Sequence, residues 1–117
     1  MQLDIRALNF PLTKDLQDYV ERRICFALSS RDEYIQRIDV HLSEVNGPFG
    51  SKDKCCHVQV VLLQISDVVI DDIEVDLYIA IDRAAERSAR TVGRCLDHYC
   101  AGSRYSSYDK LKGNVKS

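Results

Sequence analysis

No hydrophobic run in the sequence is long enough to cross a membrane. The longest unbroken aliphatic segment is Val60–Leu63, whereas a membrane-spanning helix needs about 20 apolar residues. Charged side chains at Asp4, Arg6, Lys14 and Asp15 interrupt the N-terminal region, which is unlike the apolar core of a secretory signal. We therefore expect a cytoplasmic protein with no membrane segment.

The sequence also lacks a disulfide framework. Its cysteines number five, and their spacing does not match that of small secreted disulfide-bonded domains. Zinc sites usually combine two pairs of closely spaced ligands. Here Cys55 and Cys56 are adjacent, and Cys95 and Cys100 are separated by four residues. We expect reduced thiols, no bound metal and no cofactor.

Catalytic motifs are missing as well. The three histidines, His41, His57 and His98, are far apart in the sequence, and no glycine-rich phosphate loop is present. Asp71 and Asp72 are adjacent in a predicted strand, so their side chains point to opposite faces. We predict that the protein is not an enzyme. A small hydrolase that uses one of the cysteines remains an alternative, which alkylation of the thiols would test.

The charge is distributed unevenly along the chain. The net charge is only −2, which is unusual for a nucleic-acid-binding domain. Residues 1–76 hold eight Lys or Arg against fourteen Asp or Glu, whereas residues 77–117 hold eight against four. The first segment is therefore acidic and the second basic, with net charges of −6 and +4. The positive charge gathers toward the C-terminal end.

Hydrophobic periodicity predicts six elements in the order β-α-β-β-β-α. Strands are indicated by period-two alternation, and helices by apolar residues at three- and four-residue spacing. The predicted elements are a strand at 3–7, a helix at 14–28 capped by Thr13, strands at 38–42 and 56–62 joined by a long turn at 46–54, an acidic edge strand at 68–75, and a helix from the cap Asp76 to about Tyr99. This order implies an α+β fold of two layers, with a four-stranded sheet and both helices packed on one face.

The second predicted helix has one apolar stripe and is followed by a polar segment. The stripe consists of Leu77, Ala80, Ile81, Ala84, Ser88, Thr91, Val92, Cys95 and Tyr99. Because the sequence after Cys100 is too polar to pack, we predict one folded domain at 1–100 and a flexible tail at 101–117. Tyr105 and Tyr108 in that tail either stack on unpaired bases or belong to a solubilising segment.

Four arginines recur along the second helix. Arg83, Arg87, Arg90 and Arg94 follow one another at steps of four, three and four, which places them within about 60° of one another around the axis. They would form one row facing solvent, and forked guanidinium donors suit a phosphate backbone. The alternative is a solvated helix face in which Glu86 pairs with Arg83 and Arg90 and no ligand is bound.

Residues 76–82 carry a resemblance to a known family. Their sequence, Asp-Leu-Tyr-Ile-Ala-Ile-Asp, resembles the Asp-x-Tyr-x-Ala-Ile-Asp signature of ribosome hibernation-promoting factors and the ribosome-associated inhibitor, the sigma-54 modulation protein family. Thr13, Leu16, Tyr19 and Val20 are similar to the family's first helix. The resemblance extends from residue 1 to about residue 99.

This resemblance implies a function and a set of contacts. Such a domain would bind the small ribosomal subunit and its rRNA and would silence translation in stress or stationary phase. We expect a monomer or weak homodimer that does not bind DNA. Carried over by position, the expected RNA contacts are Arg22, Arg23, Arg83, Arg87, Arg90 and Arg94.

The chain also departs from the family pattern. Phe26 and Leu96 occupy positions where relatives usually carry lysine, and residues 67–76 include five acidic side chains. Fewer phosphate contacts weaken RNA binding at physiological salt. An alternative is therefore a protein-interaction or regulatory module of the same fold that no longer binds the ribosome. The open face of the sheet, at Cys55, His57, Gln59, Val61 and Leu63, is a rival surface for self-association.

Overall fold

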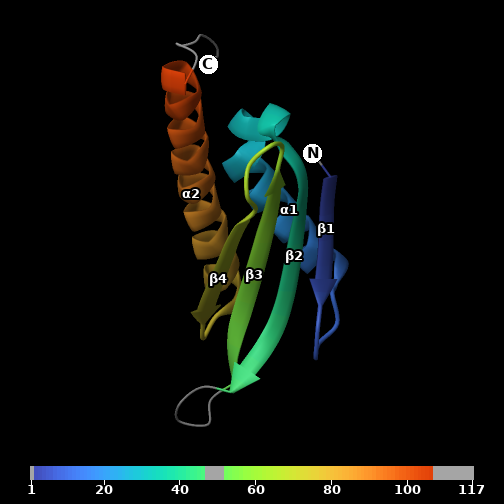
Figure 1. Cartoon of the computed structure of the whole chain (residues 1–117). Coiled ribbons are helices and arrows are strands. Elements are labelled where there is room, and N and C mark those ends of the chain that lie inside the picture. Colours follow the sequence, from blue (N-terminus) through green and yellow to red (C-terminus); the bar gives the residue numbers. More distant parts are fainter. Residues whose placement is uncertain (1, 47–51, 107–117) are drawn as a thin grey trace.

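The order of elements along the chain is the predicted one, with one addition. The computed structural model describes residues 2–46 and 52–106, with side chains up to Tyr99 in the last helix. Its elements are β1 (Gln2–Ala7), α1 (Lys14–Leu28), the 3-10 helix η1 (Ser29–Tyr34), β2 (Ile35–Asn46), β3 (Lys52–Leu62), β4 (Val68–Glu74) and α2 (Leu77–Ser106) (Figure 1). The addition is η1, which was not predicted from the sequence.

The strands form one sheet in the order β1-β2-β3-β4. β1 is parallel to β2, while the β2–β3 and β3–β4 pairs are antiparallel. Both helices lie on the same face of this sheet, where α2 packs on β3 and β4 and α1 lies beside α2 and β1 (Figure 1). The predicted α+β class, with two layers and both helices on one face, is confirmed. β4 is an edge strand, as its acidic side chains indicated.

The strands bury one face and expose the other. Along β2, Ile38, Val40 and Leu42 are fully buried, and they alternate with side chains on the open face. Val58 and Val60 of β3 are likewise fully buried, so both central strands contribute to one core under the helices. This alternation follows directly from the period-two pattern in the sequence.

α1 begins where the sequence predicts. The side-chain oxygen of Thr13 accepts a hydrogen bond from the backbone N–H of Leu16 at 3.2 Å, which satisfies one of the unpaired donors of the first turn. The helix buries one residue in each turn on the side facing the sheet, namely Leu16, Val20, Ile24 and Leu28.

α2 buries a wider arc than the predicted stripe. Asp76 caps it, with its carboxylate accepting from the backbone N–H of Tyr78 at 2.8 Å. Ala85 and Leu96 are buried although they were not predicted to be, whereas Tyr99 is 38% exposed. The wider arc has a physical reason, because α2 contacts α1 as well as the sheet. The C-terminal part of α2 extends past the end of the sheet (Figure 1).

The predicted end of α2 was wrong. The helix continues to Ser106 instead of stopping near Tyr99, because its backbone hydrogen bonds are local and residues 100–106 contain no proline. Residues 101–106 of the predicted tail therefore belong to α2, and residues 107–117 lie outside the described residues.

The predicted turn at 46–54 was too long, since β2 and β3 remain paired up to Asn46 and Lys52. The rest of that turn, residues 47–51, also lies outside the described residues.

Gly93 leaves room for the side chain of Arg31, from η1, to lie against α2. A Cβ at this position would lie 3.3 Å from Nη2 of Arg31, and Nη2 lies 3.8 Å from the carboxylate of Asp97. Glycine in a helix costs about 1 kcal/mol relative to alanine. Here it permits the close approach of Arg31 to the helix.

Candidate nucleic-acid interface

The four arginines of α2 are exposed, as their spacing predicted. The side chains of Arg83 and Arg90 are both 63% exposed and that of Arg87 is 46% exposed, while Arg94 is also on the surface. They come from successive turns of one helix, so these residues follow one another along its surface.

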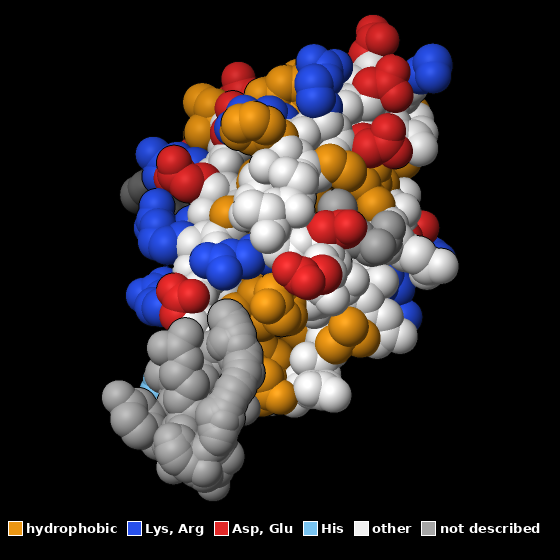
Figure 2. All heavy atoms as spheres, turned by 90° about the horizontal axis from the view of Figure 1, so that it is seen from above, with side chains coloured by type: hydrophobic (Ala, Val, Ile, Leu, Met, Phe, Trp, Pro, Cys, Tyr) orange, Lys and Arg blue, Asp and Glu red, His pale blue; other side chains and the backbone are white. Residues whose placement is uncertain are grey.

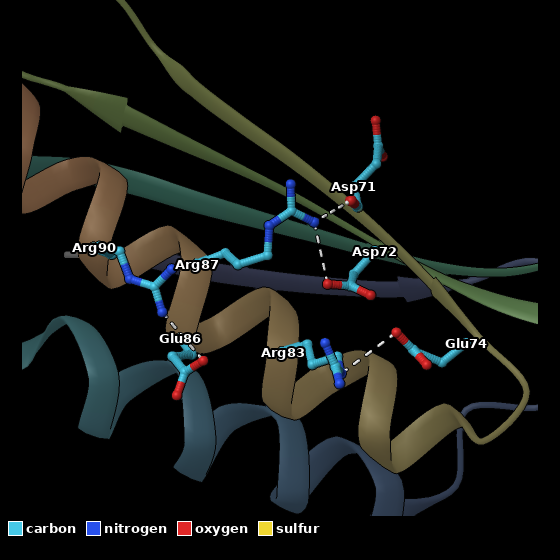
Figure 3. Close-up of polar contacts among 7 residues, drawn as sticks. All are labelled: Asp71, Asp72, Glu74, Arg83, Glu86, Arg87 and Arg90. Carbon is cyan, nitrogen blue, oxygen red and sulfur yellow. Dashed lines mark hydrogen bonds and ion pairs between the residues drawn. The ribbon is translucent and has the colours of Figure 1, made fainter.

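Carboxylates of the same chain contact three of these arginines (Figure 3). Nε of Arg83 lies 3.5 Å from Glu74 at the end of β4, and Nη2 of Arg90 lies 3.3 Å from Glu86, one turn away. The predicted pairing of Glu86 with Arg90 is confirmed, whereas that with Arg83 was wrong because the end of β4 brings Glu74 to this arginine. Solvent-accessible ion pairs such as Arg83–Glu74 and Arg90–Glu86 contribute about 0–1 kcal/mol to stability. A phosphate can therefore displace either carboxylate at low cost.

Arg87 has a different environment. Its Nη1 donates to the carboxylate of Asp72 at 3.1 Å and to the backbone carbonyl oxygen of Asp71 at 2.8 Å. Asp72 is buried beneath α2 with only 8% of its surface exposed. Figure 3 shows the Arg87 side chain reaching from the helix to β4. Arg87 therefore joins α2 to the edge strand and compensates a buried charge.

Arg94 and Arg22 are less constrained. Neither makes an ion pair or a side-chain hydrogen bond with any residue that the structure describes, and both are exposed. Arg23, the other predicted contact on α1, is held by Asp82 of α2, with Nε and Oδ1 2.9 Å apart. The predicted contact residues therefore divide into two that are free of carboxylates and four that are paired. Figure 2, which views the molecule from above, shows basic and acidic side chains interleaved at its surface.

Side chains of the segment 76–82, at the start of α2, contact α1. Asp82 accepts from the Tyr19 hydroxyl at 2.6 Å as well as from Arg23. The ring of Tyr78 meets that of Tyr19 edge to face, with centroids 4.8 Å apart. Residues 76–82 resemble a family signature in the sequence, but these contacts were not predicted from it. The available signal was that Tyr19 and Asp82 border the apolar faces of their helices.

The hydrogen bond between Tyr19 and Asp82 predicts a pH-dependent stability. The carboxylate of Asp82 accepts the hydrogen bond of the Tyr19 hydroxyl and so raises the pKa of Tyr19 above its usual 10.0. The folded state therefore holds the hydroxyl proton more tightly than the unfolded state does. The stabilisation is complete below about pH 10 and is lost as pH rises through the raised pKa. We expect Tyr19→Phe to lower the free energy of unfolding by about 1 kcal/mol at pH 7.

Urea unfolding at pH 7 and at about pH 11 would measure this difference, which should shrink at the higher pH. Tyr34→Phe is the control, because the Tyr34 hydroxyl makes no hydrogen bond to the described residues. Equal effects of the two substitutions at both pH values would contradict the assignment.

Three of the cysteines are unsuited to the hydrolase alternative. Burial raises the pKa of Cys56 to about 12, and burial also raises the pKa of Cys25 and of Cys55. A thiol with a raised pKa stays protonated at neutral pH and is a poor nucleophile.

On the open face, His57 lies 2.6 Å from the carboxylate of Asp71, and its ring centroid is 5.9 Å from that of His41. Within the described part of the chain, no three His, Cys, Asp or Glu side chains are grouped closely enough to hold a metal ion. The same face exposes Leu63, Val69 and Ile73 to about one half.

Searches against known proteins gave one family and several similar structures. The family model described as "Sigma 54 modulation protein / S30EA ribosomal protein" matches residues 3–98. The crystal structure of the N-terminal domain of Protein Y from Thermus thermophilus has a TM-score of 0.66 and 28% identity, covering 80% of this chain and 98% of that one. A ribosomal subunit interface protein from Coxiella burnetii has a TM-score of 0.70 and 16% identity, covering 83% and 99%. No curated relative matches the sequence.

No helix among the described residues is long and apolar enough to span a membrane.

Proposed function

The chain belongs to the sigma 54 modulation protein / S30EA ribosomal protein family, and on that premise we propose that it binds the small ribosomal subunit through rRNA and silences translation in stress or stationary phase. The protein would act in the cytoplasm, as a binding factor and not as an enzyme. One observation carries the proposal, namely the exposed arginine row on α2 in a chain that matches this family over residues 3–98.

The proposed contacts differ in how readily they reach RNA. Arg94 and Arg22 are exposed and free of carboxylate partners in the described structure, so they can meet phosphates directly. Arg83 and Arg90 can exchange Glu74 and Glu86 for a phosphate, because these solvent-accessible ion pairs contribute little stability. Arg87 and Arg23 are occupied by Asp72 and Asp82, so they contribute little net positive potential and instead position α2 against β4 and α1.

Co-sedimentation with purified small subunits over a range of salt concentrations tests the proposal. Four phosphate contacts predict a slope of log affinity against log salt of about −3, since each contact contributes about 0.7 to 0.9. A protein that stays unbound even at about 50 mM salt, or one whose binding does not change with salt, would contradict it.

A second function is favoured by the same ion pairs. Because Arg83, Arg87 and Arg90 each face a carboxylate, the net positive potential of the row is lower than four arginines would give. A protein-interaction or regulatory module that retains the family fold without ribosome binding would have such a surface. A pull-down at physiological salt that recovers protein partners, but neither rRNA nor ribosomal proteins, would support this second function.

A further inference from the structure

A surface pocket lies at the C-terminal end of the arginine row. It occupies about 550 Å³ between α2 and the segment that connects β3 to β4, and Arg94 is part of its wall. The other walls are formed by Ile65, Ser66, Thr91, Cys95, His98 and Tyr99. The pocket is within the size range of small-molecule sites, which combine apolar walls with a few polar groups.

One wall of the pocket is fixed by an unusual loop conformation. The Tyr99 hydroxyl donates to the side-chain oxygen of Gln64 at 3.0 Å, which holds the tyrosine ring in place. Gln64 has a φ of 68°, in the left-handed region that residues other than glycine seldom adopt. Such strained residues cluster at binding sites, because the surrounding contacts must hold them there.

The charge of the pocket differs from that of the rest of the row. The preceding three arginines of α2 each face a carboxylate. Among the side chains that the structure describes, no carboxylate pairs with Arg94 and none lines the pocket. The pocket therefore combines a free cation with aromatic and apolar walls. This combination is complementary to a ligand with a flat ring beside a negative group.

We propose that this pocket receives an unstacked base of single-stranded RNA, with an adjacent phosphate on Arg94. The inference rests on the proposed function and adds a base-binding position to it. Sequence-tolerant binding of single strands combines base stacking on aromatic side chains with cations that follow the backbone. Arg90 precedes Arg94 by one helical turn, about 6 Å along the axis, so the strand can continue from the pocket along the row.

The test separates the base from the phosphates. Two fluorescein-labelled probes of equal charge are titrated into the full chain, an adenosine RNA decamer and a decamer of the same backbone without bases. We expect the wild type to bind the base-bearing probe about tenfold more tightly, within the range for stacking one base. Tyr99→Ala should remove most of this difference and leave the affinity for the abasic probe unchanged.

Two further variants define the roles of the walls. Tyr99→Phe keeps the ring and loses the hydrogen bond to Gln64, so it should retain at least about one third of the wild-type affinity for the base-bearing probe. Arg94→Gln should weaken binding of both probes and lower the salt slope by about 0.7, the contribution of one phosphate on a single strand.

Several results would overturn the assignment. These are equal wild-type affinity for the two probes, no binding of either, or equal losses with Tyr99→Ala on both. If Tyr99→Ala changes the sedimentation coefficient or the thermal midpoint but not RNA affinity, the pocket is covered by a second copy or by the chain itself. Co-sedimentation of the wild type with small subunits is measured in parallel. Subunit binding by a wild type that does not distinguish the two probes rejects the pocket and leaves the proposed function standing. A wild type that distinguishes the probes but does not bind the subunit rejects the function.

Discussion

Replacing Arg87 by alanine should lower the free energy of unfolding by about 2–3 kcal/mol, more than any other single change in the arginine row. Asp72 would remain beneath α2 with its side chain 9% exposed and without the guanidinium that lies 3.1 Å away. Removing one member of a fully buried pair costs about 3–5 kcal/mol, and the 46% exposure of Arg87 reduces this cost through solvent screening. Urea unfolding with the slope held common to all variants would measure it.

Two variants make this result specific. Arg90→Ala, which removes only an exposed pair with Glu86, should change stability by less than about 0.5 kcal/mol. The double change Arg87→Met/Asp72→Leu should recover most of the loss, because it removes the buried charge together with its partner. If Arg87→Ala were no more destabilising than Arg90→Ala, the role assigned to Arg87 would be wrong.

The double variant Arg90→Glu/Arg94→Glu, which reverses both charges, should lower the affinity for small ribosomal subunits by at least about 100-fold. Each lost phosphate contact removes roughly a factor of ten near 0.1 M salt, and the new carboxylates add repulsion. Neither arginine contacts a buried group among the described residues, so the fold should be retained. Quantitative co-sedimentation at fixed salt, with circular dichroism to verify folding, would measure the change.

The matched control for this double reversal lies on the opposite face of the sheet. Arg6 and Arg37 are exposed there and, within the described part of the chain, pair with neighbouring acids of their own strands, Asp4 and Asp39. Arg6→Glu/Arg37→Glu alters the net charge by the same amount but should leave subunit affinity within about threefold, since charges this far from the RNA are largely screened. Equal losses for the two double variants would mean that net charge, and not the row, governs binding.

Most of the fold could be predicted because local patterns determined it. Alternation placed Ile38, Val40 and Leu42 on the core face, and the cap at Thr13 set the start of α1. The end of α2 could not be predicted from packing, because a helix can extend without it. Leu96 was missed because the hydrophobic period of one helix does not specify how much of its surface other elements cover, and α2 contacts α1 as well as two strands.

The candidate site was predicted less completely. The spacing of the arginines was sufficient to place them in one exposed row, since that depends only on helical geometry. Glu86 was foreseen as a partner of Arg90. Asp72 and Glu74 were not, because they reach the row through the packing of β4 against α2. The pocket beside Arg94 also depends on residues from two separate segments, Ile65 and Ser66 on one side and α2 on the other.

The carboxylates tethered beside Arg83 and Arg90 have a consequence for selectivity. A tethered acid competes at a high effective concentration, so a free nucleotide or an inorganic anion that meets one arginine at a time gains little by displacing it. A polymer that engages successive turns of α2 at once gains several contacts in one association event. The surface should therefore ignore the abundant small anions of a cell and retain only long, regularly spaced polyanions.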